Sequence, residues 1–213
     1  QNLTLRQALS TWQWYALWLT LFLNTTAGIA IISQASPMAQ EISHASAATA
    51  AGLVGIISIG NSSGRFLWAW LSDAIGRRAV FLSMFLLQAV VFVVLAQVST
   101  FATLAILACV ILLCYGGGFG TMPAFAADYF GSKDIGPIYD LMLTAWGTAG
   151  VIGPSLIAHV RQVTGEYQGA LRIMALITLL SAVVPLLLRP PALRLGQALE
   201  QGPHEEKSSP PSA

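Results

Sequence analysis

Arg65 is the residue of this sequence best suited to hold a charged ligand, because its charge lies within a predicted membrane-spanning segment. It precedes Asp73 by about two helical turns, which places it roughly 10 Å inside a predicted membrane-spanning helix. Charged side chains at that depth are costly and usually face a cavity or a partner. A planar guanidinium suits a carboxylate, so we expect Arg65 to bind an anion. Two other roles stay open: extension to the membrane interface, or an ion pair with Asp140.

Polar and aromatic side chains in other apolar segments are further candidates for the same cavity. Such side chains can hydrogen-bond a small ligand or form an aromatic wall around it. They are Asn24, Thr25, Thr26, Asn61, Tyr115, Thr144 and Trp146. For each of them the alternative is a hydrogen bond between packed helices.

No residue pattern favours an enzyme, a metal site or a cofactor. His44 and His159 have no neighbouring ligand residues, and Cys109 and Cys114 lack the CxxC spacing of thiolate sites. The glycine-rich run at 116–120 has neither the preceding strand nor the lysine of a phosphate-binding loop. We therefore expect no catalytic residue, no metal and no cofactor.

The elements that must position these residues are predicted to be membrane-spanning helices. Apolar residues make up 55% of the 213 residues, charged residues make up 9%, and the mean hydropathy is +0.69. That composition leaves too little polar surface for a soluble protein, so the bilayer is an expected partner. Long apolar runs without strict alternation favour helices over barrel strands. A net charge of +1, with scattered basic residues, excludes a nucleic-acid partner.

We predict an all-α membrane protein with six transmembrane helices in one bundle over residues 11–189. The expected helices span residues 12–32, 47–71, 80–98, 101–125, 139–158 and 170–188. Pro37 and the polar residues after it are expected to end the first helix. Residues 1–10 are interpreted as the end of a cytoplasmic central loop, and residues 190–213 as a disordered cytoplasmic tail.

The positions of lysine and arginine predict the orientation of this bundle. Both chain ends lie on one side together with Arg77, Arg78 and Lys133, whereas the opposite side carries only Arg161 and Arg172. Basic residues accumulate in cytoplasmic loops. Both termini are therefore predicted to be cytoplasmic, in a plasma or inner membrane.

The segment that joins the second and third predicted helices carries a recognisable motif. It reads GRFLWAWLSDAIGRR over residues 64–78. It resembles the loop motif of the major facilitator superfamily, G-x-L-S/A-D-x-x-G-R-R/K, with Ala69 in place of the leading glycine. The motif is thought to latch two halves of such transporters in one access state. The resemblance assigns this charge relay to Asp73, Arg77 and Asp128, and we add Arg78 and Asp140 as candidates for gating or the relay. The alternative for each charge is ordinary anchoring at the cytoplasmic side.

Two glycine-rich segments resemble one branch of that superfamily, the oxalate/formate antiporters and monocarboxylate porters. They read YGGGFGTMP over 115–123, followed by DYFG, and WGTAGVIGP over 146–154. Dicarboxylate exchangers of the branch carry a second basic residue in the fifth helix, and residues 139–158 of this sequence contain none. The resemblance therefore implies a small organic anion, with a monocarboxylate favoured over oxalate. Asp140 is a candidate site for a co-transported proton.

These resemblances imply one half of a twelve-helix solute transporter that works by alternating access. Its partner is expected to be an N-terminal six-helix half of the same protein or a second copy, and the start at Gln1 favours a fragment. Two other classes stay open: a non-transporting membrane sensor or assembly partner with the same fold and, ranked behind it, a membrane enzyme. Symport, antiport and uniport are not distinguished.

Overall fold

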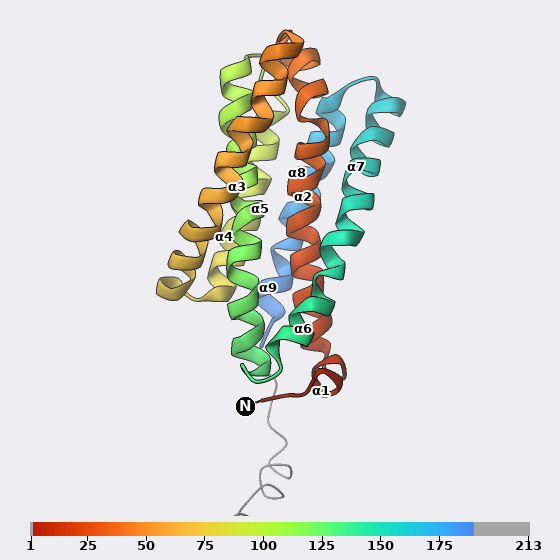
Figure 1. Ribbon diagram of the computed structural model, residues 1–213. Helices are drawn as coiled ribbons and strands as arrows, with labels where there is room; N and C mark the ends of the chain where they lie inside the picture. Colours follow the sequence, from red (N-terminus) through yellow and green to blue (C-terminus); the bar gives the residue numbers. More distant parts are fainter. Residues whose placement is uncertain (1, 190–213) are drawn as a thin grey trace, which may run out of the picture.

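The computed structural model describes residues 2–189, and that part of the chain contains only α-helices besides its turns. The helices are α1 Leu5–Leu9, α2 Trp12–Ser43, α3 Ala47–Ile75, α4 Arg77–Leu95, α5 Phe101–Phe130, α6 Ile135–Met142, α7 Thr144–Thr164, α8 Tyr167–Ser181 and α9 Val183–Leu187. Figure 1 shows the long helices side by side along one axis, with α1 and the start of the chain at the lower end. The all-α prediction is confirmed, and the predicted tail at 190–213 lies outside the described residues.

The bundle has two ends, each marked by residues at which the chain turns. Gly76 and Gly131, with φ of 89° and 87°, turn the chain at one end, which we call the Gly76 end. His44 and Gly165, with φ of 53° and 78°, end α2 and α7 at the opposite end, the Gly165 end. Positive φ disfavours residues that carry a Cβ, which explains the three glycines at these turns.

Most of the predicted spans are apolar enough to cross a membrane. Within residues 2–189, five helical stretches meet both the length and the composition of a membrane span. They are Trp12–Ser43, Arg77–Leu95, Phe101–Phe130, Ile135–Thr164 and Tyr167–Leu187. The remaining span, α3, which corresponds to the second predicted helix, has 29 residues but is not among them. Its glycines and serines, together with Asn61 and Arg65, lower its apolar content.

Several expected helix boundaries are wrong. The first helix does not end before Pro37 but continues to Ser43, because Met38 and Ala39 are buried against other helices and that packing outweighs one lost hydrogen bond. The fifth predicted helix is divided at Leu143 into α6 and α7, and the sixth at Ala182 into α8 and α9. α4 covers residues 77–95 rather than 80–98, and the predicted loop at 1–10 contains α1.

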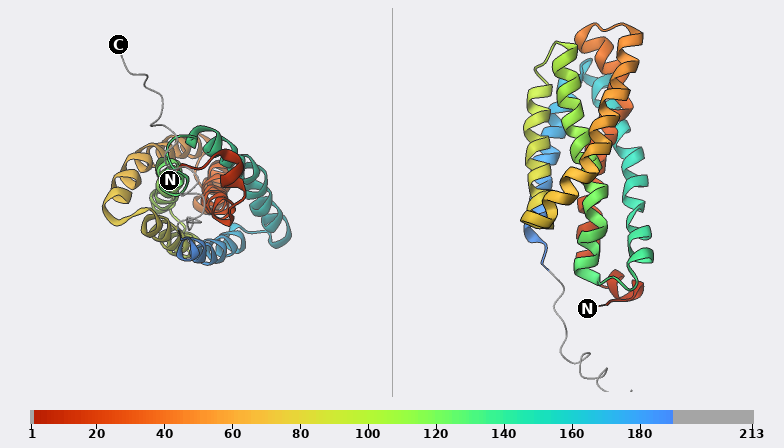
Figure 2. Two further views of the ribbon diagram at one scale, coloured as in Figure 1. Left: turned by 90° about the horizontal axis from the view of Figure 1, so that it is seen from below. Right: turned by 60° about the vertical axis from the view of Figure 1, so that its left-hand side comes forward.

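Two apolar clusters fill the bundle, one toward each end. The cluster toward the Gly76 end is rich in phenylalanine, with Phe81, Phe85, Phe125 and Phe130 fully buried. The cluster toward the Gly165 end includes Phe92 and Tyr167 among smaller side chains from α2, α3, α5 and α8. Around these clusters α3 packs on α5, α2 packs on α5 and α7, and α4 packs on α8. The views in Figure 2 agree with these pairings.

Candidate functional site

Glycines bring the backbones of α3 and α5 into direct contact. A methyl group added to Gly64 would overlap the carbonyl oxygen of Leu113, and one added to Gly116 would overlap that of Asn61. Gly120 meets the carbonyl of Arg65 in the same way. Small residues four apart permit such close approach in membrane helices. The contact sets the depth of Arg65 relative to the side chains of α5.

Arg65 lies over an aromatic cluster formed by Tyr115, Phe119 and Trp146. Its guanidinium carbon is 5.4 Å from the centroid of the Phe119 ring. That ring meets Tyr115 edge to face, with centroids 5.2 Å apart, and Trp146 at 6.2 Å. The indole Nε1 of Trp146 donates a hydrogen bond of 3.1 Å to the hydroxyl of Tyr115. The structure thus brings together three predicted site residues from α3, α5 and α7.

The cluster is open on the Arg65 side. Arg65 is exposed and Trp146 is half exposed, whereas Tyr115 is buried. Within residues 2–189, Arg65 makes no salt bridge, so the alternative pair with Asp140 is not formed. A guanidinium stacked on an aromatic face keeps its hydrogen-bond donors available for a carboxylate.

Phe119 was not among the predicted site residues, although it is central to this cluster. An aromatic residue in an apolar helix is usually a packing residue, so its type alone gives no signal. Its spacing does: Phe119 follows Tyr115 by four residues and therefore lies on the same helix face. That spacing could have identified it.

A charge network joins α3, α4 and α5 at the Gly76 end. A terminal nitrogen of Arg77 lies 2.6 Å from Asp73 Oδ1, and its Nε lies 3.4 Å from Asp128 Oδ2. Arg77 also donates to the hydroxyl of Ser72. The positive φ of Gly76 allows α4 to start directly after α3, which brings these groups together. Three residues of the predicted charge relay therefore meet.

Arg78 and Asp140 lie apart from this network. Arg78 donates to the carbonyl oxygens of Pro185 and Leu186, at 3.2 and 2.9 Å, and so satisfies acceptors at the end of α9. Asp140 is exposed on α6 and forms no salt bridge within the described part of the chain.

Asn24 lies in the packed interior rather than on the exposed face that carries Arg65. It is fully buried, and its Nδ2 donates to the carbonyl of Cys114 at 3.2 Å. Gln88 Nε2 donates to Asn24 Oδ1 at 3.0 Å, so this pair links α2, α4 and α5. The predicted residue Asn61 is half buried, and its Oδ1 lies under Gly116 without a hydrogen-bond partner in residues 2–189.

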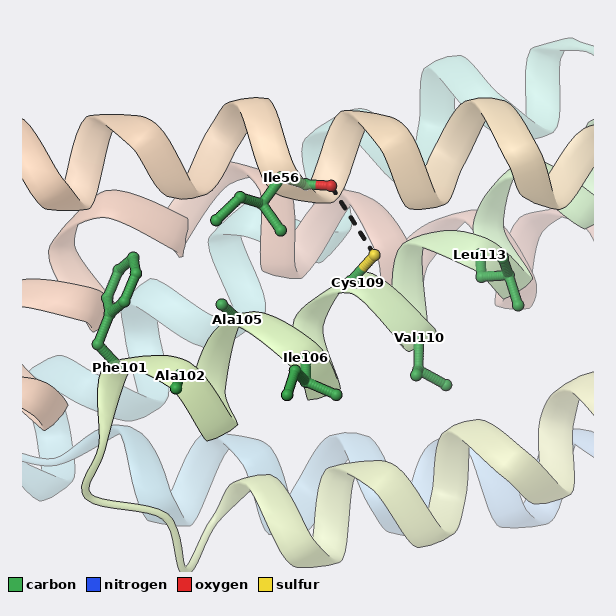
Figure 3. A pocket seen from close by; sticks show the side chains of 8 residues that line it. All are labelled: Ile56, Phe101, Ala102, Ala105, Ile106, Cys109, Val110 and Leu113. Atoms are coloured by element: carbon green, nitrogen blue, oxygen red, sulfur yellow. Dashed lines mark hydrogen bonds between the residues drawn. The ribbon is translucent and has the colours of Figure 1, made fainter.

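One groove on the bundle is not suited to an anion. It has a volume of about 530 Å³ and lies between α3 and α5, toward the Gly165 end. Figure 3 shows its lining, in which the only dashed contact joins Cys109 Sγ to the Ile56 carbonyl at 3.8 Å. The other side chains drawn are apolar, so the groove offers no donor to a carboxylate.

Comparisons with known proteins found one matching family model and two similar sequences. The sequence model of the Major Facilitator Superfamily matches residues 17–211. An uncharacterized MFS-type transporter of Escherichia coli strain K12, YhjX, is 27% identical over 156 residues, which cover 71% of this chain and 38% of that protein. The oxalate:formate antiporter of Oxalobacter formigenes is 27% identical over 157 residues, which cover 72% and 37%. The chain therefore spans less than two fifths of either relative.

Proposed function

Because this chain belongs to the major facilitator superfamily, as the sequence motifs predicted, we propose that it forms half of a transporter that moves a small organic anion by alternating access. The chain itself is an integral, multi-pass membrane protein with the fold of half such a transporter. In our proposal Arg65 binds the anion, and Tyr115, Phe119 and Trp146 form one wall of the path. No enzymatic step is involved.

The exposed guanidinium of Arg65 is the observation that carries this proposal. A charge on a helix of this kind is costly unless it faces water, a ligand or a partner. Arg65 has an aromatic neighbour but no carboxylate within salt-bridge distance in residues 2–189. An anionic substrate would supply the missing negative charge and would do so reversibly.

A monocarboxylate is the proposed substrate class. One relative is an oxalate:formate antiporter by name, so small carboxylates are the natural starting point. A dicarboxylate needs two positive partners, and α6 and α7 contain no lysine or arginine before Arg161. A single guanidinium neutralises a single carboxylate. Asp140, exposed on α6, is the proposed site of a co-transported proton.

The second half of the transporter is proposed to cover the exposed faces of α3 and α7. Phe66 and Trp70 on α3 are 79% and 68% exposed. Gly52 and Gly55 on α3, and Gly147 and Gly150 on α7, face open space. Small residues without a partner in this bundle suit close contact with another helix. An N-terminal six-helix half, or a second copy, would supply that helix.

The remaining assignments follow from the same proposal. The network of Asp73, Arg77 and Asp128 would act as the latch between access states. The Gly76 end would face the cytoplasm of a plasma or inner membrane, with residues 1–10 closing a central loop and residues 11–189 forming the bundle.

Uptake into vesicles that contain the intact protein tests the anion site. Labelled formate and labelled oxalate are offered under an imposed proton gradient to wild type, Arg65→Gln and Arg65→Lys. We expect saturable formate uptake that falls by about tenfold or more in Arg65→Gln, because the anion loses its charge partner. Arg65→Lys should recover part of it. Arg6→Gln, at an exposed cation on α1, serves as the matched control.

Each outcome separates one part of the proposal from the rest. Equal uptake by wild type and Arg65→Gln would remove Arg65 from the site. Binding of formate without uptake would favour a sensor. Asp140→Asn is expected to abolish the effect of the proton gradient and to retain formate binding, whereas an unchanged gradient effect would exclude Asp140 as the proton site.

A further inference from the structure

A second groove lies on another side of the bundle, between α4 and α8. Its volume is about 450 Å³. α4 contributes Val90, Val93 and Val94, and α8 contributes Leu176 and Leu179. Arg172 is the only charged residue in its lining. The groove is therefore a hydrocarbon surface with one cation, unlike the apolar groove in Figure 3.

The cation lies near one end of the groove. Arg172 is five residues after the first residue of α8, about 8 Å from the Gly165 end of that helix. Val93 and Val94 belong to the last turn of α4, at the same end of the bundle. Leu179 is seven residues further along α8, about 10 Å deeper. Along a span that covers Tyr167–Leu187, the groove thus runs from near one membrane surface toward the bilayer centre.

Arg172 has no oppositely charged partner within the described part of the chain. Arg172 is exposed and forms no salt bridge or side-chain hydrogen bond in residues 2–189. The surface around it is aliphatic, with Val90 62% and Leu180 61% exposed. A long arginine side chain can lie along such a surface and place its guanidinium at the headgroup level.

We propose that this groove binds one acyl chain of an anionic phospholipid, whose phosphate is held by Arg172. The lipid is the occupant because it joins an anion at the interface to a hydrocarbon chain that descends from it. A guanidinium matches a phosphate in geometry as well as in charge. The aliphatic walls match the chain. This proposal rests on the membrane location of the bundle and is independent of any role for Arg65.

The groove between α3 and α5 provides an internal control. It has similar size but an apolar lining with no cation. It can accept hydrocarbon, but it has nothing to distinguish one headgroup from another. Headgroup selectivity should therefore appear at the α4–α8 groove and be absent at the α3–α5 groove of the same molecule.

Photo-crosslinking in phosphatidylcholine vesicles that contain the intact protein tests this selectivity. The probe is a phosphatidylglycerol with a photoreactive acyl chain, and labelled peptides are identified by mass spectrometry. We expect labelling at Val90–Val94 and Leu176–Leu179 that unlabelled phosphatidylglycerol displaces about fivefold better than added phosphatidylcholine with the same chains. Labelling near Ile106 and Val110, in the control groove, should be displaced equally by both lipids.

Variants connect the selectivity to the two parts of the groove. Arg172→Gln should equalise displacement by the two lipids at the α4–α8 groove, Arg172→Lys should retain the preference, and the Arg6→Gln control should leave it unchanged. Leu176→Trp, at an exposed position, should fill the space and reduce labelling with either headgroup. Glycerol phosphate, which lacks acyl chains, should not compete.

Three results would overturn the proposal. One is equal displacement by both lipids in wild type. Another is a preference that survives in Arg172→Gln. The third is competition by glycerol phosphate as strong as that by phosphatidylglycerol, which would indicate a site for a free anion instead of a lipid.

Discussion

The α3–α5 pair and the α2–α7 pair are held together by different means. α3 meets α5 through backbone contacts at Gly64, Gly116 and Gly120, where no side chain intervenes. α7 packs a row of small residues, four apart, on α2: Ala145, Ala149 and Gly153, followed by Ile157. Polar side chains then hold α7 near both of its ends.

The polar side-chain contacts that join α7 to α2 are few and far apart. Near the Gly76 end, Trp18 Nε1 donates to Thr144 Oγ1 at 2.9 Å. Near the Gly165 end, Arg161 pairs with Glu41, and its guanidinium lies 4.9 Å from the centroid of the Tyr167 ring. Side-chain contacts can break one at a time. The backbone contacts between α3 and α5, which we call the α3–α5 seam, cannot loosen unless the two helices separate along its length. We therefore predict that α7 is more mobile than α3, although Gly153 also brings α7 close to the α2 backbone at the carbonyl of Thr26.

A methyl group added at the α3–α5 seam should have the largest effect on the stability of the bundle. Gly64→Ala places a Cβ against the carbonyl of Leu113, and the two helices must separate to accept it. Overpacking of this kind costs about 2 kcal/mol or more. Thermal unfolding of the intact protein in detergent measures the loss. Gly169→Ala is the matched control, since a Cβ there makes only ordinary contacts. Equal melting temperatures for the two variants would show that the seam is not rigid.

Asn24 links the α2–α7 pair to the α3–α5 pair. Removing its side chain should have an intermediate effect on the free energy of unfolding. Asn24 on α2 donates to the Cys114 carbonyl of α5 and accepts from Gln88 on α4, so Asn24→Ala removes both interhelical bonds and leaves the buried Gln88 amide nitrogen without its acceptor. We expect a loss of about 1–2 kcal/mol in the same unfolding experiment. Thr25→Val removes only bonds to carbonyls of its own helix and should cost much less. A similar loss in both variants would count against an interhelical role for Asn24.

Breaking one contact of α7 should have the smallest effect, and a local one. Arg161→Gln removes the ion pair with Glu41 and the contact with Tyr167. Hydrogen exchange in residues 156–164 should accelerate by no more than about fivefold, because the pair is exposed. Exchange in α3 should stay unchanged and is the internal control. Acceleration in both helices would mean that α3 and α7 open together, contrary to the comparison.

Apolar run length predicted the number and order of the long helices, but not all of their ends. Pro37 was expected to stop the first helix, yet buried neighbours on both sides keep α2 continuous. The division at Leu143 has no proline or glycine at the break. At the break Leu143 has ψ of −13°, and its amide donates to two carbonyls, that of Tyr139 at 3.0 Å and that of Asp140 at 3.2 Å. Such local geometry is not visible in residue types.

The sequence predicted the charged residues of the candidate site better than it predicted which residues surround them. Arg65 is singled out by its charge within a predicted span, and the charge network by its motif. The interior position of Asn24 could not be predicted, because in a helix that is apolar on all sides the spacing of one polar residue does not reveal which face is buried. The partner of Asn24, Gln88, needed the packing of α4 to become apparent.

The seam between α3 and α5 also bears on how the chain enters the bilayer during synthesis. α3 emerges from the ribosome before α5, with α4 between them. Of the six long segments, α3 is the one that does not reach the apolar content of a membrane span within residues 2–189. Its glycine-lined backbone is therefore left facing lipid or the insertion machinery until α5 arrives to cover it. Retention of α3 in the membrane thus depends on a segment not yet made, and slow synthesis between residues 75 and 130 should increase the fraction of chains in which α3 fails to insert.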